Sequence, residues 1–521
     1  MKKNPNSLWI AAIVLGWLFD FLFWKQSFGI NFAIFAGICL IGGFLLLWIN
    51  HQRPARGTLW LIPLILFFAA ITFIRAEPMT LFLGILFTLF LMGLLATTFI
   101  GGRWFEYNLA DYGYGFMKLI GSMIARPILF YAEVKREQAE SGIPAKRINL
   151  WPIIRGIVIA IPIVAIFAAL LASADTIFGN QLNAFLKLFF NLDTFPEYIF
   201  RLCYILFIAY ILAGVFLHAA SQSKDEKLIG KDKPLISQFL GFTETVIVLG
   251  SVIVLFTAFV IVQFKYFFGG QANIQVGGLT YSEYARRGFG ELVAVALLSL
   301  LMILGLSSIT RRENEAQKRA YSGLSIALVA LVIVILVSAY QRLNLYEIAY
   351  GYSRLRTYTH IALICTGLLM FTVVMLEILR RERFIAFAIL AASLVFAISL
   401  GVLNVDGFIV RQNVNRATRR NNLDVPYLVS LSSDSVPVLV DEFLSPSLPT
   451  SIHEAIGAVL LCRGAQSDST QAVADWRSFT FSRWMADRAM EKASRQLANR
   501  YHLNGSASLV RTPGNVEYDC R

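Results

Sequence analysis

Arginine, tyrosine and glutamate residues gather in two short strings of an otherwise apolar chain, and together these residue types can recognise an anion. Arginine presents a planar fork of donors that fits a carboxylate or a phosphate. Tyrosine adds an amphipathic ring, and glutamate can pair with arginine or exchange a proton. The strings cover residues 280–291 and 342–360, and a polar patch follows at 404–416. The predicted ligand-binding residues are Tyr281, Glu283, Tyr284, Arg286, Arg287, Glu291, Tyr350, Arg354, Arg356, Tyr358, Asn404 and Arg411.

Three interpretations of this set stay open, because spacing alone does not distinguish them. In the first, the arginines pair with Glu283, Glu291 and Glu347, and a belt of tyrosines ties helix ends together. In the second, the same residues form a pocket for a lipid phosphate, an envelope polymer or a small acid. In the third, Glu283 or Glu291 is an acid or base beside stabilising arginines. We assign no catalytic residue.

The elements that must position these residues are membrane-spanning helices. Of the 521 residues, 57% are hydrophobic and 15% are charged, whereas soluble domains carry about 25% charged residues. Apolar runs of about 20 residues cross a bilayer as helices. This pattern excludes a soluble globular protein and predicts an all-α, polytopic transmembrane helical bundle. The eleven expected spans are 8–24, 28–49, 59–74, 78–100, 156–174, 198–219, 242–268, 289–309, 322–341, 360–379 and 384–403.

The chain divides into four segments on this basis. Residues 1–100 hold the first four transmembrane helices, and residues 101–155 form a basic cytoplasmic or interfacial segment. Residues 156–403 form a seven-helix transmembrane core, and residues 404–521 an extramembrane, mainly helical tail.

Lysine and arginine predict the orientation of the bundle, because they accumulate on the cytoplasmic side of a membrane. With a cytoplasmic N-terminus, the cytoplasmic segments hold more than twice as many of these residues as the short loops opposite. An odd number of spans then places the tail outside. Residues 116–131 contain Lys118 and Arg126 and are expected to lie in the interface. If they cross instead, every later loop changes sides.

Cysteine and histidine residues indicate no metal site. Cys462 and Cys520 are the two cysteines outside the predicted spans, and an extracytoplasmic compartment would allow them to form a disulfide. Two unpaired thiols are the other outcome. The chain has no CxxC motif, and its five histidines are scattered. We therefore predict no metal and no cofactor.

The polar strings also carry a resemblance to a known family. The matching stretches are residues 263–270, 281–289, 346–358, 404–416 and 423–432, which include Tyr-Ser-Glu-Tyr-Ala-Arg-Arg-Gly-Phe and Tyr-Gly-Tyr-Ser-Arg-Leu-Arg. In these stretches the chain resembles a bacterial multi-pass membrane family catalogued only as a domain of unknown function. The resemblance implies a bacterial plasma (inner) membrane protein. It implies no reaction and no site residue.

These observations together predict a plasma-membrane protein with an outward-facing Arg/Tyr/Glu site for an anionic ligand or lipid head group. We expect a role in envelope sensing or partner binding, with membrane lipids and envelope or signalling proteins as partners and no nucleic acid. One alternative is a secondary transporter, which calls for polar groups near the bilayer midplane. The other is a membrane enzyme acting on a lipid-linked substrate.

Overall fold

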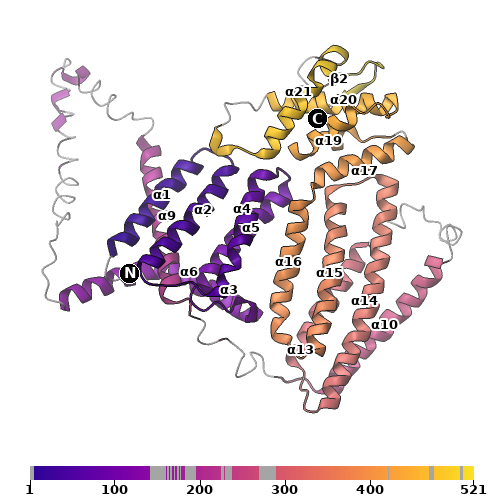
Figure 1. The fold of residues 1–521 in the computed structure, drawn as a ribbon, viewed down its shortest axis with the longest axis horizontal. Coiled ribbons are helices and arrows are strands. Elements are labelled where there is room, and N and C mark those ends of the chain that lie inside the picture. The colour runs from indigo at the N-terminus through magenta and orange to yellow at the C-terminus, as the bar shows by residue number, and fades with distance from the viewer. Residues whose placement is uncertain are drawn as a thin grey trace. The chain divides into compact units, whose positions relative to one another are not determined.

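The computed structural model describes residues 5–140, 195–224, 238–268, 289–420, 422–468, 475–504 and 509–520, together with Leu228 and a few residues between 160 and 181. The chain forms two compact units, and helices make up most of the described residues (Figure 1). The first unit comprises residues 1–25, 38–53 and 117–222. The second comprises residues 26–37, 54–116 and 223–521.

The first unit is built on α1 (Pro5–Phe23) and α9 (Phe195–Ser221), whose backbones approach closely. A Cβ atom added at Gly16 would lie 2.5 Å from the carbonyl oxygen of Ile205, so glycine is required at this crossing. At one end of the pair, Arg201 donates to both carboxylate oxygens of Asp20, which is 2% exposed. A buried carboxylate needs such a partner. Parts of α2 (Ile30–Ile49) and α6 (Leu109–Glu140) complete this unit.

The central helix of the second unit is α14 (Glu315–Tyr350), which is 36 residues long. It packs against α10 (Phe242–Phe268), α13 (Phe289–Ile309) and α15 (Arg354–Ile378), and Figure 1 shows it between α10 and α15. Its buried residues recur every three or four positions, as one face of a helix requires. The hydroxyl of Tyr321 donates to the carbonyl oxygen of Ile303 at 2.9 Å, which joins the start of α14 to the end of α13.

The remaining helices of the bundle in this unit are shorter. Helix α4 (Leu61–Ile74) packs on α5 (Pro78–Thr98), and α16 (Ile385–Val402) contacts both α5 and α15. The rings of Phe68 and Phe87 stack between α4 and α5 with centroids 5.1 Å apart. Three short elements complete this part of the second unit: α3 (Arg56–Leu59), η1 (Trp104–Glu106) and η2 (Glu382–Phe384).

Ten helices among the described residues are long and apolar enough to span a membrane. They coincide with ten of the eleven predicted spans, and this confirms the expected all-α polytopic architecture. The eleventh, 156–174, lies largely outside the described residues. Helix α6 contains residues 116–131 but is not among the ten, since charged residues such as Lys118 and Arg126 interrupt its apolar sequence.

The chain after α16 forms a folded C-terminal module, residues 405–520, and belongs to the second unit. It is mainly helical, and it also contains a three-stranded antiparallel sheet in the order β1-β2-β3, which the sequence analysis did not predict. In its register His502 faces Arg511, and Leu509 faces Asp519. The elements are α17 (Val405–Arg420), α18 (Val425–Val429), η3 (Ser433–Ser435), α19 (Val436–Phe443), α20 (Thr450–Asp468), η4 (Trp476–Ser478), α21 (Phe481–Arg500), β1 (His502–Asn504), β2 (Leu509–Arg511) and β3 (Glu517–Asp519).

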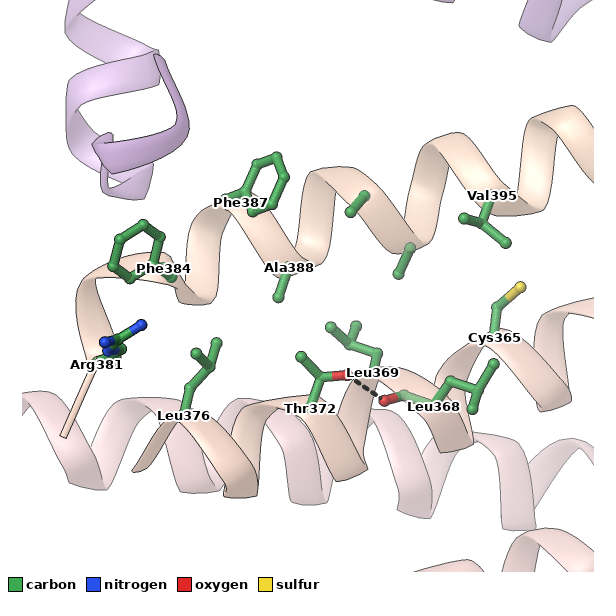
Figure 2. A pocket seen from close by; sticks show the side chains of 12 residues that line it. Cys365, Leu368, Leu369, Thr372, Leu376, Arg381, Phe384, Phe387, Ala388 and Val395 are labelled. Carbon is green, nitrogen blue, oxygen red and sulfur yellow. Dashed lines mark hydrogen bonds between the residues drawn. The ribbon is translucent and has the colours of Figure 1, made fainter. Parts of the chain in front are cut away.

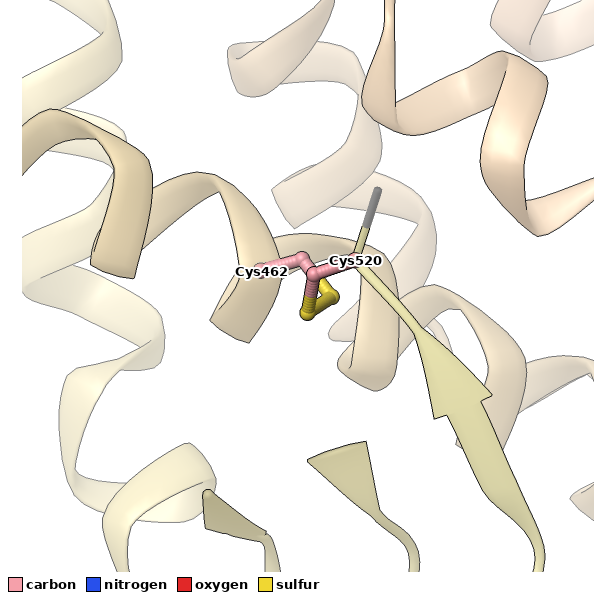
Figure 3. The surroundings of a disulfide bond; sticks show 2 residues. All are labelled: Cys462 and Cys520. Atoms are coloured by element: carbon pink, nitrogen blue, oxygen red, sulfur yellow. A yellow bond between two sulfur atoms is a disulfide. The ribbon is translucent and has the colours of Figure 1, made fainter. Parts of the chain in front are cut away.

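A disulfide joins Cys462 in α20 to Cys520, directly after β3 (Figure 3). The sequence left this pairing open. Both cysteines are buried, and side chains of the contacting helices α19 and α20, including Leu439, Ile456 and Val459, are fully buried as well. The module therefore has its own apolar interior and a covalent link between its helices and its sheet.

Replacing both Cys462 and Cys520 by serine should destabilise the C-terminal module. The bond closes a loop across a sequence separation of 58, and chain entropy alone predicts a loss of roughly 4 kcal/mol in unfolding free energy. The loss is measured by unfolding the purified protein with denaturant in detergent, with the protease resistance of the module as the readout. The matched control is Cys203→Ser, because Cys203 is exposed and free. Equal resistance of the double variant and the control would contradict a stabilising role.

Candidate functional site

Polar side chains of α15, α17, η3 and the connection between α4 and α5 meet at one end of the second unit, where five helix ends come together. Here α4 ends, α5 and α15 begin, α16 ends and α17 begins. We call this cluster the polar rim, and its members are Arg75, Glu77, Arg354, Tyr358, Asp406 and Asp434.

Glu77 is placed at the rim by its role as the N-terminal cap of α5. Its carboxylate accepts hydrogen bonds from the backbone nitrogens of Met79 at 3.0 Å and Thr80 at 2.7 Å. Pro78 follows as the first helical residue. An acidic cap satisfies free backbone N–H groups and interacts favourably with the helix dipole. Glu77 also accepts a hydrogen bond from the hydroxyl of Tyr358 in α15.

The strongest interaction in the rim joins Arg354 at the start of α15 to Asp406 in the first turn of α17. The Nε–Oδ1 distance is 2.8 Å and the Nη2–Oδ2 distance is 2.6 Å, a bidentate pair. Asp406 is 0% exposed and also accepts from the backbone nitrogen of Ser432 at 2.6 Å. Glu77 adds a second negative charge, 4.0 Å from Arg354 Nε. Arg354 thus holds a transmembrane helix to the C-terminal module.

Asp434 forms a second junction between the module and the bundle. Its Oδ2 atom accepts from the backbone nitrogens of Ala76 at 2.7 Å and Glu77 at 3.0 Å. Arg75 lies 3.9 Å from Oδ1 and donates to the carbonyl oxygens of Gly401 and Val402, each at 3.0 Å. Burial raises the pKa of the Asp434 carboxyl, and the hydrogen bond from Ala76 and the charge of Arg75 oppose this shift.

Arg463 of α20 brings a third guanidinium to the same region. It donates to the carbonyl oxygens of Val429, at 3.0 Å, and Leu431. Burial lowers the pKa of this guanidinium, and the carboxylate of Asp406 opposes the shift. Three carboxylates, those of Glu77, Asp406 and Asp434, are therefore accompanied by three arginines, and the formal charges balance.

A pair formed by a buried glutamate and a partly buried histidine lies between α14 and α15. Nε2 of His360 is 2.8 Å from Oε2 of Glu347, which is 1% exposed. The ring of Tyr340 packs edge-on against His360, with centroids 4.6 Å apart. Among the residues that the structure describes, Glu347 Oε1 and His360 Nδ1 are buried without a hydrogen-bond partner. Each residue of this pair thus keeps one polar atom without a hydrogen-bond partner, whereas no buried side-chain atom of the polar rim lacks one among the described residues.

The turn between α14 and α15 depends on Gly351, whose φ is +88°. A Cβ atom there would lie 2.7 Å from Oδ1 of Asn413, so both the backbone angle and the space require glycine. Asn413 accepts from the backbone nitrogen of Tyr352 at 2.8 Å and donates to its carbonyl oxygen at 2.9 Å. Arg356 donates to the carbonyl oxygen of Gly351.

The described members of the predicted ligand-binding set have the following positions. Arg354 and Tyr358 belong to the polar rim. Asn404 donates to the carbonyl oxygen of Asp434 at 2.9 Å and so helps to seat the module. The guanidinium of Arg356 lies 4.1 Å from the ring centroid of Tyr346, and Tyr350 packs on that tyrosine from the end of α14. Glu291 and Arg411 are exposed on α13 and α17.

The other five predicted residues, Tyr281, Glu283, Tyr284, Arg286 and Arg287, lie outside the described residues. The partner of Arg354 is none of the glutamates that the sequence suggested but Asp406, from the polar patch after the last span. Sequence reasoning did not select Asp434 either, because it stands in a Ser-Ser-Asp-Ser run that reads as an ordinary turn. No group of three or more histidine, cysteine, aspartate or glutamate side chains in the described ranges could hold a metal ion.

Comparison with known proteins yields one match. The sequence model of the family described as "Domain of unknown function (DUF4153)" matches residues 61–442, well over half of the chain. No curated protein and no solved structure matches the chain significantly. The matched region contains the polar rim, the pair of Glu347 and His360, and the first helices of the module.

Replacing Arg354 by glutamine should destabilise the fold strongly, by about 3–5 kcal/mol, because it leaves the carboxylate of Asp406 buried without its partner. Asp406→Asn in the same background should restore part of the loss, since it removes the uncompensated charge. Thermal unfolding of the single and double variants in detergent measures this coupling. The control is Arg380→Gln, whose pair with Glu315 is exposed, and little change is expected there. Additive losses in the double variant would contradict the assigned pairing.

Proposed function

The chain belongs to the family described as "Domain of unknown function (DUF4153)", and we propose that it is an envelope-sensing or partner-binding component of a bacterial plasma membrane. Its N-terminus lies in the cytoplasm and its C-terminal module lies outside. A ligand or partner bound on the outer side acts on the module, and the polar rim passes the effect to the transmembrane helices.

The bidentate pair of Arg354 and Asp406 carries this proposal. It joins the first residue of α15 to the first turn of α17. Asp434 makes a second junction at the start of α5. Because both junctions are buried and charge-assisted, a displacement of α17 or η3 displaces the ends of two apolar helices with it. Such coupling suits a component that reports on its surroundings.

The ligand-binding part of the proposal rests on the string that precedes α13. Helices α13 and α14 are packed neighbours, and the bond from Tyr321 to Ile303 joins the end of one to the start of the other. They are therefore antiparallel, and the first turn of α13 is at the same end of the bundle as Tyr346 and Tyr350. Arg286 and Arg287 directly precede this turn in the sequence. With the tyrosines they provide the chemistry for an anionic ligand or a lipid head group.

Two observations support the orientation. Lysine and arginine are more abundant in the segments assigned to the cytoplasm. The disulfide between Cys462 and Cys520 belongs to an oxidising compartment, which the cytoplasm is not in most cells. Membrane lipids and envelope or signalling proteins are the partners that this placement implies.

The secondary-transporter alternative is favoured by one observation. Ionisable residues in membrane helices often serve ion or proton pathways, and the pair of Glu347 and His360 retains two unpartnered polar atoms among the described residues. Glu347 lies beyond the predicted apolar span 322–341, and His360 is the first residue of the span 360–379, so the pair stands near the helix ends. The enzyme alternative depends on Glu283 and on Glu291, of which the latter is exposed on α13.

The orientation predicts opposite activities for two reporter fusions. Alkaline phosphatase fused after Arg521 should be active, because it folds only in an oxidising compartment. The same enzyme fused after Glu313, in the connection between α13 and α14, should be inactive. The phosphatase activities of the two fusions are measured in intact cells and compared. An active fusion at 313 with an inactive one at 521 would reverse the orientation and remove the proposed outer site.

The sensing role predicts that some arginines are needed for binding and others for folding, so that their variants lose function for different reasons. In cells that lack the native gene, Arg286→Gln and Arg287→Gln should fail to restore growth under envelope stress although folded protein is produced at the normal level. Arg354→Gln should fail because folded protein is lost, since its partner is the buried Asp406. Growth and folded yield are measured side by side. Full complementation by the first two variants, or gradient-driven substrate flux in proteoliposomes, would contradict the proposal.

A further inference from the structure

A cavity of about 460 Å³ lies between α15 and α16, away from the polar rim. Figure 2 shows the side chains that line it from both helices, with Arg381 at one end and Cys365 and Val395 at the other. A cavity of about 350 Å³ shares Cys365, Leu369 and Ala392 with it and reaches α5. The two adjoin along α15 and α16, and most of their lining residues are apolar.

The space exists because α16 presents small residues where α15 presents large ones. Ala388, Ala391 and Ala392 recur at helical spacing on the face of α16 that lines the cavity. Leu368, Leu369 and Leu376 line the opposite wall on α15. Thr372 is the one hydroxyl-bearing side chain in this lining, and it donates to the carbonyl oxygen of Leu368 at 2.8 Å. Between Arg381 and the thiol of Cys365, the walls of the larger cavity are therefore apolar apart from this bonded hydroxyl.

The end of this space at Arg381 carries a positive charge, whereas its walls are uncharged. The neighbouring charges are already paired: Arg380 with Glu315, and Glu382 with Arg312 at 3.1 Å. Arg381 is exposed, lines the cavity, and makes no ion pair or side-chain hydrogen bond with any residue that the structure describes. An unpaired cation therefore stands at the mouth of an apolar groove.

A second arginine in the same turn has unused hydrogen-bonding capacity. Arg383 donates through Nε to the carbonyl oxygen of Glu106 at 2.7 Å. Its Nη2 atom is buried and has no partner among the described residues. The connection between α15 and α16 thus holds a guanidinium without an acidic partner and a further N–H group without an acceptor.

We propose that this groove binds an anionic glycerophospholipid, with an acyl chain between α15 and α16 and the phosphate at Arg381. The order of groups along the groove matches such a lipid: a positive charge beside the helix ends, where head groups lie, and an unbroken apolar surface along the spans. Charge complementarity selects an anionic head group over a zwitterionic one. This site is at the opposite end of α15 from the polar rim, so it is independent of the proposed sensing role.

Native mass spectrometry of the full chain tests the site. The protein in detergent is mixed with equimolar phosphatidylglycerol and phosphatidylcholine that carry the same acyl chains. The retained lipid should favour phosphatidylglycerol by about fivefold, as one well-placed arginine predicts. Arg381→Gln should bring this ratio close to one, whereas Arg381→Lys should preserve the preference. Melting temperatures of both variants establish that they are folded.

Two further variants complete the design. Arg380→Gln is the matched control, because the adjacent arginine is paired with Glu315 and lies outside the lining of the cavity. It should leave the ratio unchanged. Ala391→Leu narrows the groove and should lower retention of both lipids. An unchanged ratio in Arg381→Gln, an equal decrease in Arg380→Gln, or undiminished retention in Ala391→Leu would each overturn the proposal.

Discussion

The bidentate pair of Arg354 and Asp406 is the interaction on which the second unit depends. Transmembrane helices interact with one another mainly through shape and small residues, and shape alone does not determine where an extramembrane module sits on them. A fully buried carboxylate in α17 that has its guanidinium partner in α15 does determine it. The same carboxylate also accepts from Ser432, so the loop before η3 is tied to the same point. One charge pair thereby sets the relation between the membrane part and the folded module.

The arginines at the polar rim are already paired within the chain, so they are not available to an anionic ligand. Arg354, Arg75 and Arg463 are held by carboxylates and carbonyl oxygens of the chain. An anion that displaced Asp406 from Arg354 would leave a buried negative charge behind, at a large cost. The rim is therefore a junction, and recognition of an anion falls to arginines with exposed or unused donors.

The sequence was sufficient for the architecture because the bilayer restricts the choice of structure. A run of about 20 apolar residues has one stable solution in hydrocarbon, and the ten described spans follow from that rule. Partner choice was beyond reach, since Arg354 could pair with any nearby acid, and the distance from Asp406 exists only after folding. The strands at 502–519 were missed because three-residue strands carry too little alternation to detect.

The length of α14 has a mechanical consequence. Its 36 residues reach about 54 Å at 1.5 Å per residue, while the hydrocarbon core of a bilayer measures about 30 Å. Tyr321 near one end is anchored to α13, and Arg342 toward the other donates to Gln263 of α10 at 3.1 Å. The two anchors flank the predicted apolar span 322–341, so unwinding at either end would break one of them, and tilting is a way for α14 to follow a change in membrane thickness that keeps both. A tilt would swing the turn at Gly351, so bilayer thickness itself becomes a variable to which this protein is mechanically linked.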